Sequence, residues 1–440
     1  MTAFDPRIDA KFQSQWDAVR IAALDAGIDL AFSAELSGNR TTPLYVYERD
    51  HVLVRGADAG EVTLRNRSWE RVDDDELPGI HRYRIGGDEL VPDAVERVNR
   101  EFRAGAVTPN HLVSICPVQL CPADEPAPLP VTASQVPYPP KRDGTGGQGV
   151  QVDVLDTGLS PGYEVHGWMA GIEEWHTCVS FGPTGAIKEY AGHGTFVTGV
   201  LRCAAPGTSV RSLSIFQYAG ATTEYQLGRA LLAALNRKPD IISLSAGGST
   251  ANGLPHIALE PFFTELTRPE IRTLLVAAAG NDGSDHRFYP AAYSADAGEA
   301  VVSVGALRYD GEGRACFSNH GDWVDVYAMG ERHVNAFPVG LYSYVDPQRD
   351  DLTCRFYPKS RLYSACSCVT MPPQGAVVAF RGMARWSGTS FATPLVAGVI
   401  ADYMSSKPEQ DPRQAAQAVL GTARTIHDAD GEVIKALDYT

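Results

Sequence analysis

The chain has 440 residues, which is long for one ordinary domain and predicts two or three. Hydrophobic residues make up 44% and charged residues 21% of it, the balance of a soluble globular protein, and no apolar run approaches the roughly 18 residues that a membrane span needs. The formal net charge of −15 excludes a basic surface on average, so nucleic acid and anionic membranes are poor candidates as partners.

The start of the chain has no basic stretch followed by an apolar core, which is the pattern of a secretory signal. We therefore expect a cytoplasmic location; a secreted form whose signal has been removed is the alternative, and Met1 argues against it. The eight cysteines are an even number, but without a leader they favour reduced thiols over disulfides. Cys354, Cys366 and Cys368 lack the paired spacing of a zinc site, so we expect no metal and no cofactor.

An N-terminal extension and a small domain precede the main body of the chain. Within the extension, residues 1–40, the stretch 6–26 has the apolar periodicity of an amphipathic helix. Residues 41–116 have the pattern strand, helix, two strands, helix, strand, which predicts a small α+β domain of the ferredoxin-like type. An unrelated accessory domain is the alternative interpretation of this region.

A segment rich in proline and glycine, residues 117–147, is expected to be a flexible linker. Near its end, Gly144, Gly146 and Gly149 have the spacing of a dinucleotide-binding fingerprint. That motif requires a strand before it and a helix after it, whereas here a proline-rich segment precedes it and a strand follows. We therefore reject nucleotide binding.

The remaining residues, 148–440, have the pattern of an α/β domain. Apolar runs typical of buried strands lie at 150–155, 210–215, 241–245, 273–278 and 301–304. Helical periodicity lies between several of them, most clearly at 224–237. This alternation predicts a doubly wound, mostly parallel sheet, whose active site forms at the carboxyl ends of the strands.

Four polar residues lie at strand ends or helix starts of this domain. Asp156 ends an apolar strand and is followed by a tight Thr-Gly turn, although the same three residues are also ordinary turn chemistry. Asn281 follows another apolar strand. His193 lies between glycines at the start of a helix, and Ser390 begins a helix, where a helix cap is the simpler interpretation. An aspartic protease would need a second Asp-Thr-Gly, which this chain could supply only as a dimer.

Together, these motifs resemble those of the subtilisin-like (subtilase) serine protease family. Asp-Thr-Gly at 156, His-Gly-Thr at 193, Ala-Ala-Gly-Asn ending at 281 and Gly-Thr-Ser-x-Ala-x-Pro around 390 occur in the family's order, and the resemblance covers about 148–426. It implies an endopeptidase acting on proteins or peptides. Ser390 would be the nucleophile, His193 the general base and Asp156 its orienting partner. The Asn281 amide and the Ser390 backbone N–H would form the oxyanion hole.

The same resemblance implies how the substrate is held. An extended peptide would lie between residues 245–247 and about 218–220, bound through its main chain as an added strand. Phe288 matches the floor of the pocket for the residue before the scissile bond, so small or medium side chains are expected there. Asp282 would add negative charge at the rim, which implies some tolerance for basic side chains. The implied substrate-binding residues are Ser245, Ala246, Gly247, Ala278, Ala279, Gly280, Asp282 and Phe288.

Two departures from the family pattern, the position of residues 41–116 and two competing functions complete the interpretation. An insertion occupies about 333–384, and the short stretch after the helix of His193 lacks an Asn-rich calcium loop. Residues 41–116 stand where many subtilases carry a prodomain, which implies either a removable segment or a retained module able to take a regulatory protein partner. An inactive binding protein is disfavoured, because all four catalytic positions carry competent residue types. An ester hydrolase would need a Gly-x-Ser-x-Gly elbow, which Ser390 does not have.

Overall fold

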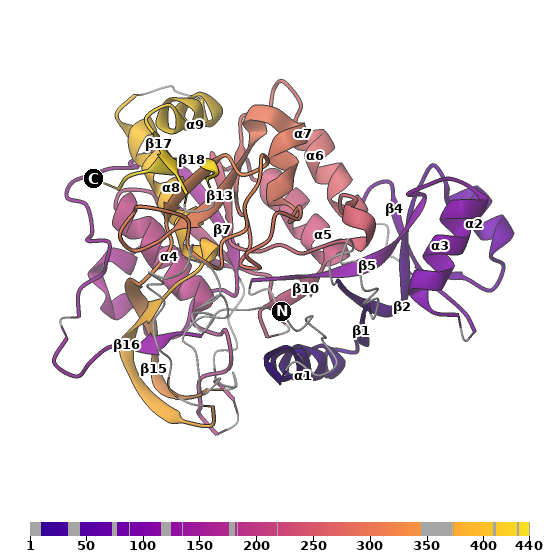
Figure 1. The fold of residues 1–440 in the computed structure, drawn as a ribbon, viewed down its shortest axis with the longest axis horizontal. Helices are drawn as coiled ribbons and strands as arrows, with labels where there is room; N and C mark the ends of the chain where they lie inside the picture. Colours follow the sequence, from indigo (N-terminus) through magenta and orange to yellow (C-terminus); the bar gives the residue numbers. More distant parts are fainter. Residues whose placement is uncertain are drawn as a thin grey trace.

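The fold consists of a small N-terminal part and a larger C-terminal part that lie side by side (Figure 1). The computed structural model describes residues 10–33, 45–72, 77–87, 89–115, 125–133, 135–175, 181–182, 184–217, 219–344, 372, 374–407, 411–428 and 431–439. No helix in these ranges is both long and apolar enough to cross a membrane.

The N-terminal part is an antiparallel sheet with two helices packed on one face. After α1 (Ala10–Asp25), its elements are β1 (Leu30–Phe32), β2 (Val46–Arg55), α2 (Ala59–Arg65), β3 (Glu70–Arg71), β4 (Ile80–Arg84), α3 (Val91–Glu101) and β5 (Val107–Ser114). The strands lie in the order β5-β2-β4-β3, and β1 pairs with the other end of β2. Apolar residues of α2 and α3, such as Val62 and Val95, cover Val52 and Val54 of the central strand.

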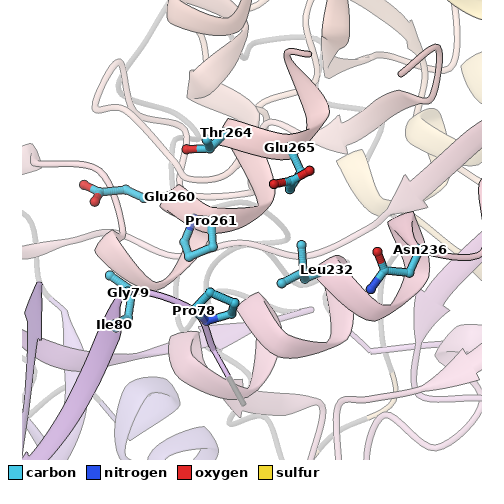
Figure 2. Close-up of a pocket in the computed structure, with 9 residues that line it drawn as sticks. All are labelled: Pro78, Gly79, Ile80, Leu232, Asn236, Glu260, Pro261, Thr264 and Glu265. Atoms are coloured by element: carbon cyan, nitrogen blue, oxygen red, sulfur yellow. The ribbon is translucent and has the colours of Figure 1, made fainter. Parts of the chain in front are cut away.

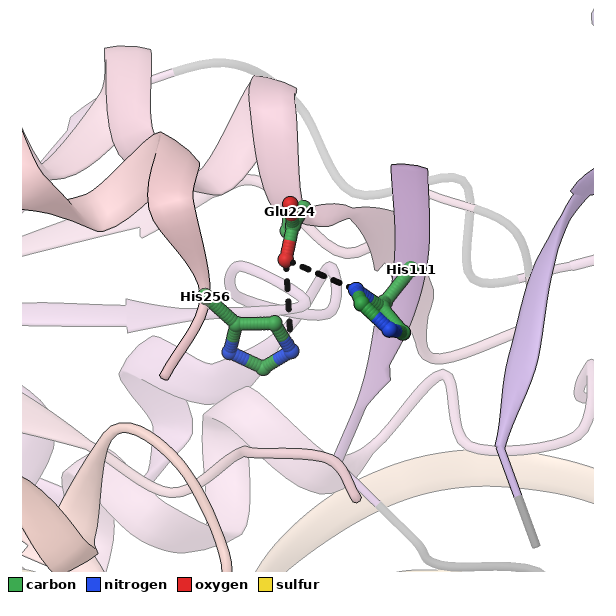
Figure 3. A group of neighbouring side chains, drawn as sticks. All are labelled: His111, Glu224 and His256. Carbon is green, nitrogen blue, oxygen red and sulfur yellow. Dashed lines mark hydrogen bonds and ion pairs between the residues drawn. The ribbon is translucent and has the colours of Figure 1, made fainter. Parts of the chain in front are cut away.

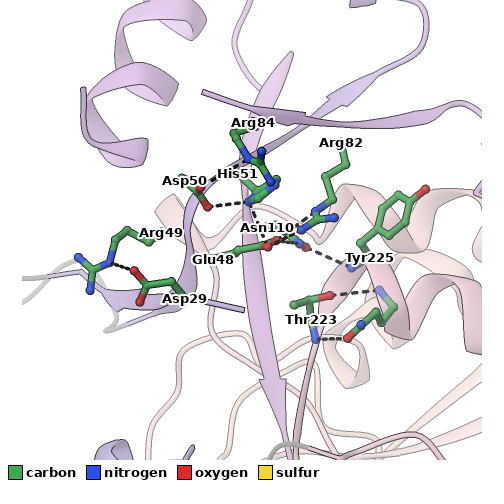
Figure 4. Close-up of polar contacts among 11 residues, drawn as sticks. Asp29, Glu48, Arg49, Asp50, His51, Arg82, Arg84, Asn110, Thr223 and Tyr225 are labelled. Carbon is green, nitrogen blue, oxygen red and sulfur yellow. Dashed lines mark hydrogen bonds and ion pairs between the residues drawn. The ribbon is translucent and has the colours of Figure 1, made fainter. Parts of the chain in front are cut away.

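A buried carboxylate ties three strands of this part together (Figure 4). Glu48 on β2 is 2% exposed and accepts hydrogen bonds from Arg82 on β4 and, at 2.7 Å, from Asn110 on β5. Its other partner is His51, whose Nδ1 lies 3.0 Å away. Burial alone would raise the pKa of this carboxyl, but hydrogen bonding from His51 and the charge of Arg82 lower it to about 2.

The C-terminal part is built on the mostly parallel, doubly wound sheet that the sequence predicted. In the described residues, nine strands form this sheet in the order β17-β18-β14-β13-β12-β11-β7-β9-β8, and of their pairs only β17–β18 is antiparallel. Their bounds are β7 (Gln151–Asp156), β8 (Glu173–Trp175), β9 (Ser209–Ser214), β11 (Ile241–Leu244), β12 (Leu274–Ala278), β13 (Val301–Leu307), β14 (Val326–Met329), β17 (Arg424–His427) and β18 (Val433–Leu437).

Helices cover both faces of this sheet (Figure 1). α4 (His193–Ala204), α8 (Thr389–Ser405) and α9 (Pro412–Leu420) pack on one face, and α5 (Glu224–Leu235), α6 (Glu260–Leu266) and α7 (Ser294–Ala297) pack on the other. Adjacent residues of a strand serve opposite faces, as Ile241 and Ile242 of β11 do. Burial on both faces explains why these strands are continuous apolar runs in the sequence.

The insertion at about 333–384 contributes a long β-hairpin. Its arms are β15 (His333–Ser343) and β16 (Val377–Trp386), and the short β6 (Ala127–Pro128) extends the sheet beyond β16. The described part of the expected linker is therefore held against the fold, since the Tyr138 N–H also donates to the Val334 carbonyl at 2.8 Å. Proline suits such an edge strand because its missing N–H is not needed there.

The two parts are joined at the free edge of β5. β10 (Ala221–Thr223) of the C-terminal part pairs with residues 112–114, so the N-terminal sheet continues into the larger domain. Beside this junction lies an open cavity of about 580 Å³ between residues 78–80 and helices α5 and α6 (Figure 2). Glu260 at its edge pairs with Arg55 of the N-terminal part.

Candidate active site

The centre of the site is a carboxylate–imidazole pair at the end of β7 and the start of α4. His193 Nδ1 lies 2.8 Å and 3.0 Å from the two carboxylate oxygens of Asp156, and both side chains are buried. The Thr157 N–H donates to the same carboxylate at 2.7 Å. A Cβ on Gly194 would lie 2.5 Å from the Gly158 carbonyl oxygen, so only glycine allows the helix to start this close to the turn.

Aromatic side chains hold the His193 ring from the side. The indole of Trp386 meets it edge to face, with ring centroids 5.4 Å apart and planes at 90°, and Phe391 lies at the same separation. Since Nδ1–H is donated to Asp156, the lone pair is on Nε2, as a general base requires. Trp386 was missed in the sequence, because nothing in an apolar strand at the end of an insertion indicates that it contacts a histidine.

Ser390 lies at the start of α8, close to the main chain of two other segments. Its hydroxyl is 3.3 Å from the carbonyl oxygens of Ile115 and of Ser245, and the Ser245 hydroxyl donates to the Ser390 carbonyl at 2.7 Å. Among the described residues, no hydrogen bond joins the Ser390 hydroxyl to His193. In this state the hydroxyl is therefore directed to main-chain carbonyls.

Asn281 is oriented by its neighbour across the site. Its Oδ1 accepts hydrogen bonds from the Thr389 N–H at 2.9 Å and the Thr389 hydroxyl at 2.8 Å. These contacts identify which atom of the amide is the oxygen, and they leave Nδ2 as a donor on the side of Gly388. A Cβ on Gly388 would lie 3.5 Å from this Nδ2. Thr389 also accepts from the Gly280 N–H at 3.2 Å. Its orienting role was not anticipated from the sequence.

Phe288 fills the space between the two segments expected to form the specificity pocket. A Cβ on Gly247 would lie 2.2 Å from the Phe288 ring, and one on Gly280 would lie 2.9 Å from it. The ring is 3% exposed and packs against both segments. Ala246, Ala278 and Ala279 are buried in the same walls.

The carboxylate of Asp282 faces another segment of the chain. It lies 3.5 Å from the amide Nδ2 of Asn319, whose Oδ1 accepts from the Asp282 N–H at 2.9 Å. Burial raises the pKa of this carboxyl to about 6, in spite of the hydrogen bond from Asn319. The Asp282 carboxyl is therefore negatively charged mainly above that pH.

The chain's own N-terminal part occupies the extended position expected for a substrate. Ser114 and Gly247 exchange two main-chain hydrogen bonds, of 2.9 Å and 3.1 Å, and the Ile115 N–H donates to the Gly220 carbonyl at 2.9 Å. Residues 112–115 thus lie between β10 and the 245–248 segment, and the Ile115 carbonyl reaches Ser390. Tyr218, also expected on this edge, lies outside the described residues.

Possible metal and thiol chemistry lies away from this centre. Within the described ranges, three potential ligands meet at two places, one formed by His111, Glu224 and His256 and the other by Glu48, Asp50 and His51. In the second, Arg82 already pairs with Glu48. The two cysteines in the described part, Cys203 and Cys316, are buried, and burial raises the pKa of the Cys203 thiol to about 12. The other six lie outside the described residues.

The chain is similar to known proteases over much of its length. Residues 147–436 match the model of the subtilase family. The chain is 26% identical over 288 residues to an intracellular serine protease of Paenibacillus polymyxa, covering 62% of this chain and 72% of that protein. It is 25% identical to an extracellular serine proteinase of a Thermus strain, over 67% of this chain and 60% of that protein, which is less than two thirds of its length. Fervidolysin from Fervidobacterium pennivorans shares the fold over 89% of this chain and 60% of its own, with a TM-score of 0.57 and 16% identity.

Proposed function

The chain belongs to the subtilase family and is a serine-type endopeptidase, and from that premise we propose that Asp156, His193 and Ser390 are its catalytic triad. The observation that carries the proposal is the buried Asp156–His193 pair at the carboxyl end of the sheet, with Ser390 at the start of α8 beside it. The contact of Ser390 with the Ile115 carbonyl supports it further, because this is where an extended peptide reaches the serine.

In the proposed mechanism, His193 Nε2 takes the proton of the Ser390 hydroxyl as the oxygen attacks the peptide carbonyl. The hydroxyl must first turn from the carbonyls of Ile115 and Ser245 toward the imidazole. His193 then returns the proton to the leaving amine, and water releases the acyl group by the same route in reverse. Asp156 keeps the imidazole in one tautomer and stabilises its charged form.

The developing oxyanion would be bound by two donors, the Asn281 side-chain amide and the Ser390 backbone N–H at the start of α8. Thr389 supports this role, since both its N–H and its hydroxyl hold the oxygen end of the Asn281 amide. A donor fixed before the reaction costs no reorganisation when the charge appears. Loss of such a donor lowers turnover by about 10²–10³ in the subtilisin example on which this general magnitude rests.

The proposed specificity follows from the volume that Phe288 occupies. Ser245, Ala246 and Gly247 would form one wall of the pocket for the residue before the scissile bond. Residues 278–280 would form the other, and Asp282 would lie near its rim. With the aromatic ring between the walls, the pocket is shallow, so small and medium side chains are the proposed substrates. Main-chain pairing with Gly247 and Gly220 would supply most of the affinity.

For residues 41–116 we propose a ferredoxin-like domain of the prodomain type that covers the active site. The antiparallel β5-β2-β4-β3 sheet with helices on one face supports the fold, and the pairing of Ser114 with Gly247 supports the covering role. It would act either until cleavage within 117–147 or as a retained module that a protein partner displaces. The likeness to a protease named as intracellular supports a cytoplasmic location.

The test is the exchange of Ser390 for alanine in the full chain. Ser390→Ala should abolish peptide hydrolysis and labelling by a fluorophosphonate probe, while thermal unfolding changes little. Ser406→Ala is the matched control, because it lies exposed at the other end of the same helix. More than about 1% residual peptidase activity in purified Ser390→Ala would rule out Ser390 as the nucleophile.

A further inference from the structure

A cluster of three ionisable side chains is buried where the N-terminal part meets the peptidase domain (Figure 3). His111 comes from β5, Glu224 begins α5, and His256 immediately precedes the 3₁₀ turn Ile257–Leu259. Glu224 Oε2 lies 3.1 Å from His111 Nδ1 and 3.5 Å from His256 Nε2. All three side chains are at most 3% exposed. We call them the interdomain cluster.

The hydrogen bonds of His111 determine its protonation. The Ala251 N–H donates to His111 Nε2 at 3.0 Å, so this nitrogen carries a lone pair and Nδ1 carries the proton given to Glu224. A second proton on His111 would place its Nε2–H against the Ala251 N–H, so that two donors would face each other. The docked position of β5 therefore requires a neutral His111.

The other two members are incompletely satisfied. Within the described part of the chain, neither ring nitrogen of His256 makes a hydrogen bond, and Glu224 Oε1 makes none either. Buried polar atoms without partners are costly, and buried charges more so. A protonation state that leaves a net charge in the buried cluster therefore costs free energy.

A metal ion does not fit these contacts. Coordination by His111 Nδ1 would move the remaining ring proton to Nε2, where it would oppose the Ala251 N–H. Histidine ligands normally donate that second N–H to an oxygen acceptor, which is not what faces Nε2 here. The geometry thus favours proton binding over metal binding.

Three tyrosines and one ion pair surround the cluster. The Tyr45 ring packs on His111, the Tyr289 ring packs on His256, and the Tyr293 hydroxyl donates to the His256 carbonyl. Burial raises the pKa values of Tyr289 and Tyr293, which keeps these phenols neutral. The ion pair of Arg55 and Glu260 acts on Glu224 in both directions, since the charge of Glu260 raises the pKa of Glu224 and the charge of Arg55 lowers it.

We propose that the interdomain cluster makes docking of β5 in the active-site cleft depend on pH, with the tightest docking near neutrality and release on acidification. This inference rests on the proposed covering role of residues 41–116. His111 is four residues from Ile115, which contacts Ser390, so loss of its contacts loosens the segment that covers the nucleophile.

The direction follows from the protons bound in each state. Burial lowers the pKa of His111 from 6.5 to about 3 and that of His256 to about 4, so both gain protons below pH 6.5 only when β5 leaves. Burial raises the pKa of Glu224 from 4.5 to about 8. Between these pH values, Glu224 therefore carries a proton when β5 is docked and loses it when β5 leaves. Between pH 4.5 and 6.5, undocking therefore takes up one net proton, and docking weakens about tenfold per pH unit of acidification. Above pH 6.5 only Glu224 contributes, so docking weakens as the pH rises toward 8.

The experiment measures amide hydrogen exchange of Ser114 and Ile115 in the full chain carrying Ser390→Ala, from pH 5 to 8.5, with rates corrected for intrinsic exchange. Their N–H groups donate to Gly247 and Gly220, so their protection reports docking directly. We expect maximal protection near pH 6.5 and a loss of about tenfold per pH unit below it. Because this chain needs no catalysis, the result does not depend on the triad assignment.

Variants separate the contributions. His111→Gln should make protection independent of pH between 5 and 6.5, and Glu224→Gln should remove the alkaline decline while steepening the acid one. If His111→Gln undocks at every pH, His256→Gln provides the same test from the peptidase side. His286→Gln, at an exposed histidine outside the cluster, should leave the profile unchanged. A pH-independent profile in the parent, an unchanged acid slope in the variants, or a rise in protection on adding Zn²⁺ would overturn the proposal.

Discussion

Replacing Phe288 with alanine should deepen the specificity pocket and change which substrates the enzyme prefers. The ring is 3% exposed and lies where a Cβ on either Gly247 or Gly280 would collide with it. Its removal vacates an aromatic-sized volume between the two proposed walls. A phenylalanine before the scissile bond could then enter that volume, whereas in the parent it is excluded.

The magnitude follows from apolar burial. Enclosing an aromatic side chain contributes about 1.5–3 kcal/mol relative to leaving it exposed, which corresponds to roughly 10- to 150-fold in kcat/KM. The ratio of kcat/KM for phenylalanine over alanine at this substrate position should rise by that factor. The variant should also lose about 3–5 kcal/mol of unfolding free energy, because a buried phenylalanine is truncated.

The assay compares two peptides that differ only at this position, at a temperature where unfolding measurements show the variant to be folded. Phe263→Ala is the matched control, since Phe263 is also buried but lies on α6, where its ring stacks on Tyr293. It should lower stability without altering the ratio. An unchanged ratio in folded Phe288→Ala would show that the ring does not limit the pocket.

Three further predictions concern the oxyanion donor, the N-terminal sheet and metal dependence. Thr389→Val should reduce kcat about tenfold or more with little change in KM, because Asn281 loses one orienting hydrogen bond. Thr389→Ser keeps the hydroxyl and should retain most activity, so an equal kcat for the two variants would contradict this role. Glu48→Gln should lower stability above pH 4.5 by up to about 3 kcal/mol, because the native pKa of about 2 lies below the unfolded value. That advantage is lost as the pH falls from 4.5 to 2, so unfolding of the variant should vary less with pH over this interval. A chelator should leave the melting temperature nearly unchanged, because α4 is followed only by the short Ala205–Thr208 turn; a fall of many degrees would reveal a bound cation.

Much of the peptidase fold could be predicted from the sequence because its rules are local. Continuous apolar runs such as 241–244 and 274–278 are strands buried on both faces, and such strands occur in parallel sheets covered by helices. Since the carboxyl ends of parallel strands meet at one edge, the sequence predicts that Asp156 and Asn281 lie at the same edge of the sheet. The small residues beside His193 likewise indicated a close approach of main chains, which the Gly194–Gly158 contact shows.

Contacts between distant parts of the chain were decided only by tertiary structure. Ile115 meets Ser390 across 275 positions, and Thr389 holds Asn281 across 108. Trp386 reaches His193 only because the hairpin folds back over α4. Periodicity reports which face of an element is buried, but not which distant residue covers it, because that depends on the path of the whole chain. For the same reason, His111, Glu224 and His256 look unremarkable in the sequence. Their shared proton balance exists only because docking of β5 removes them from water together.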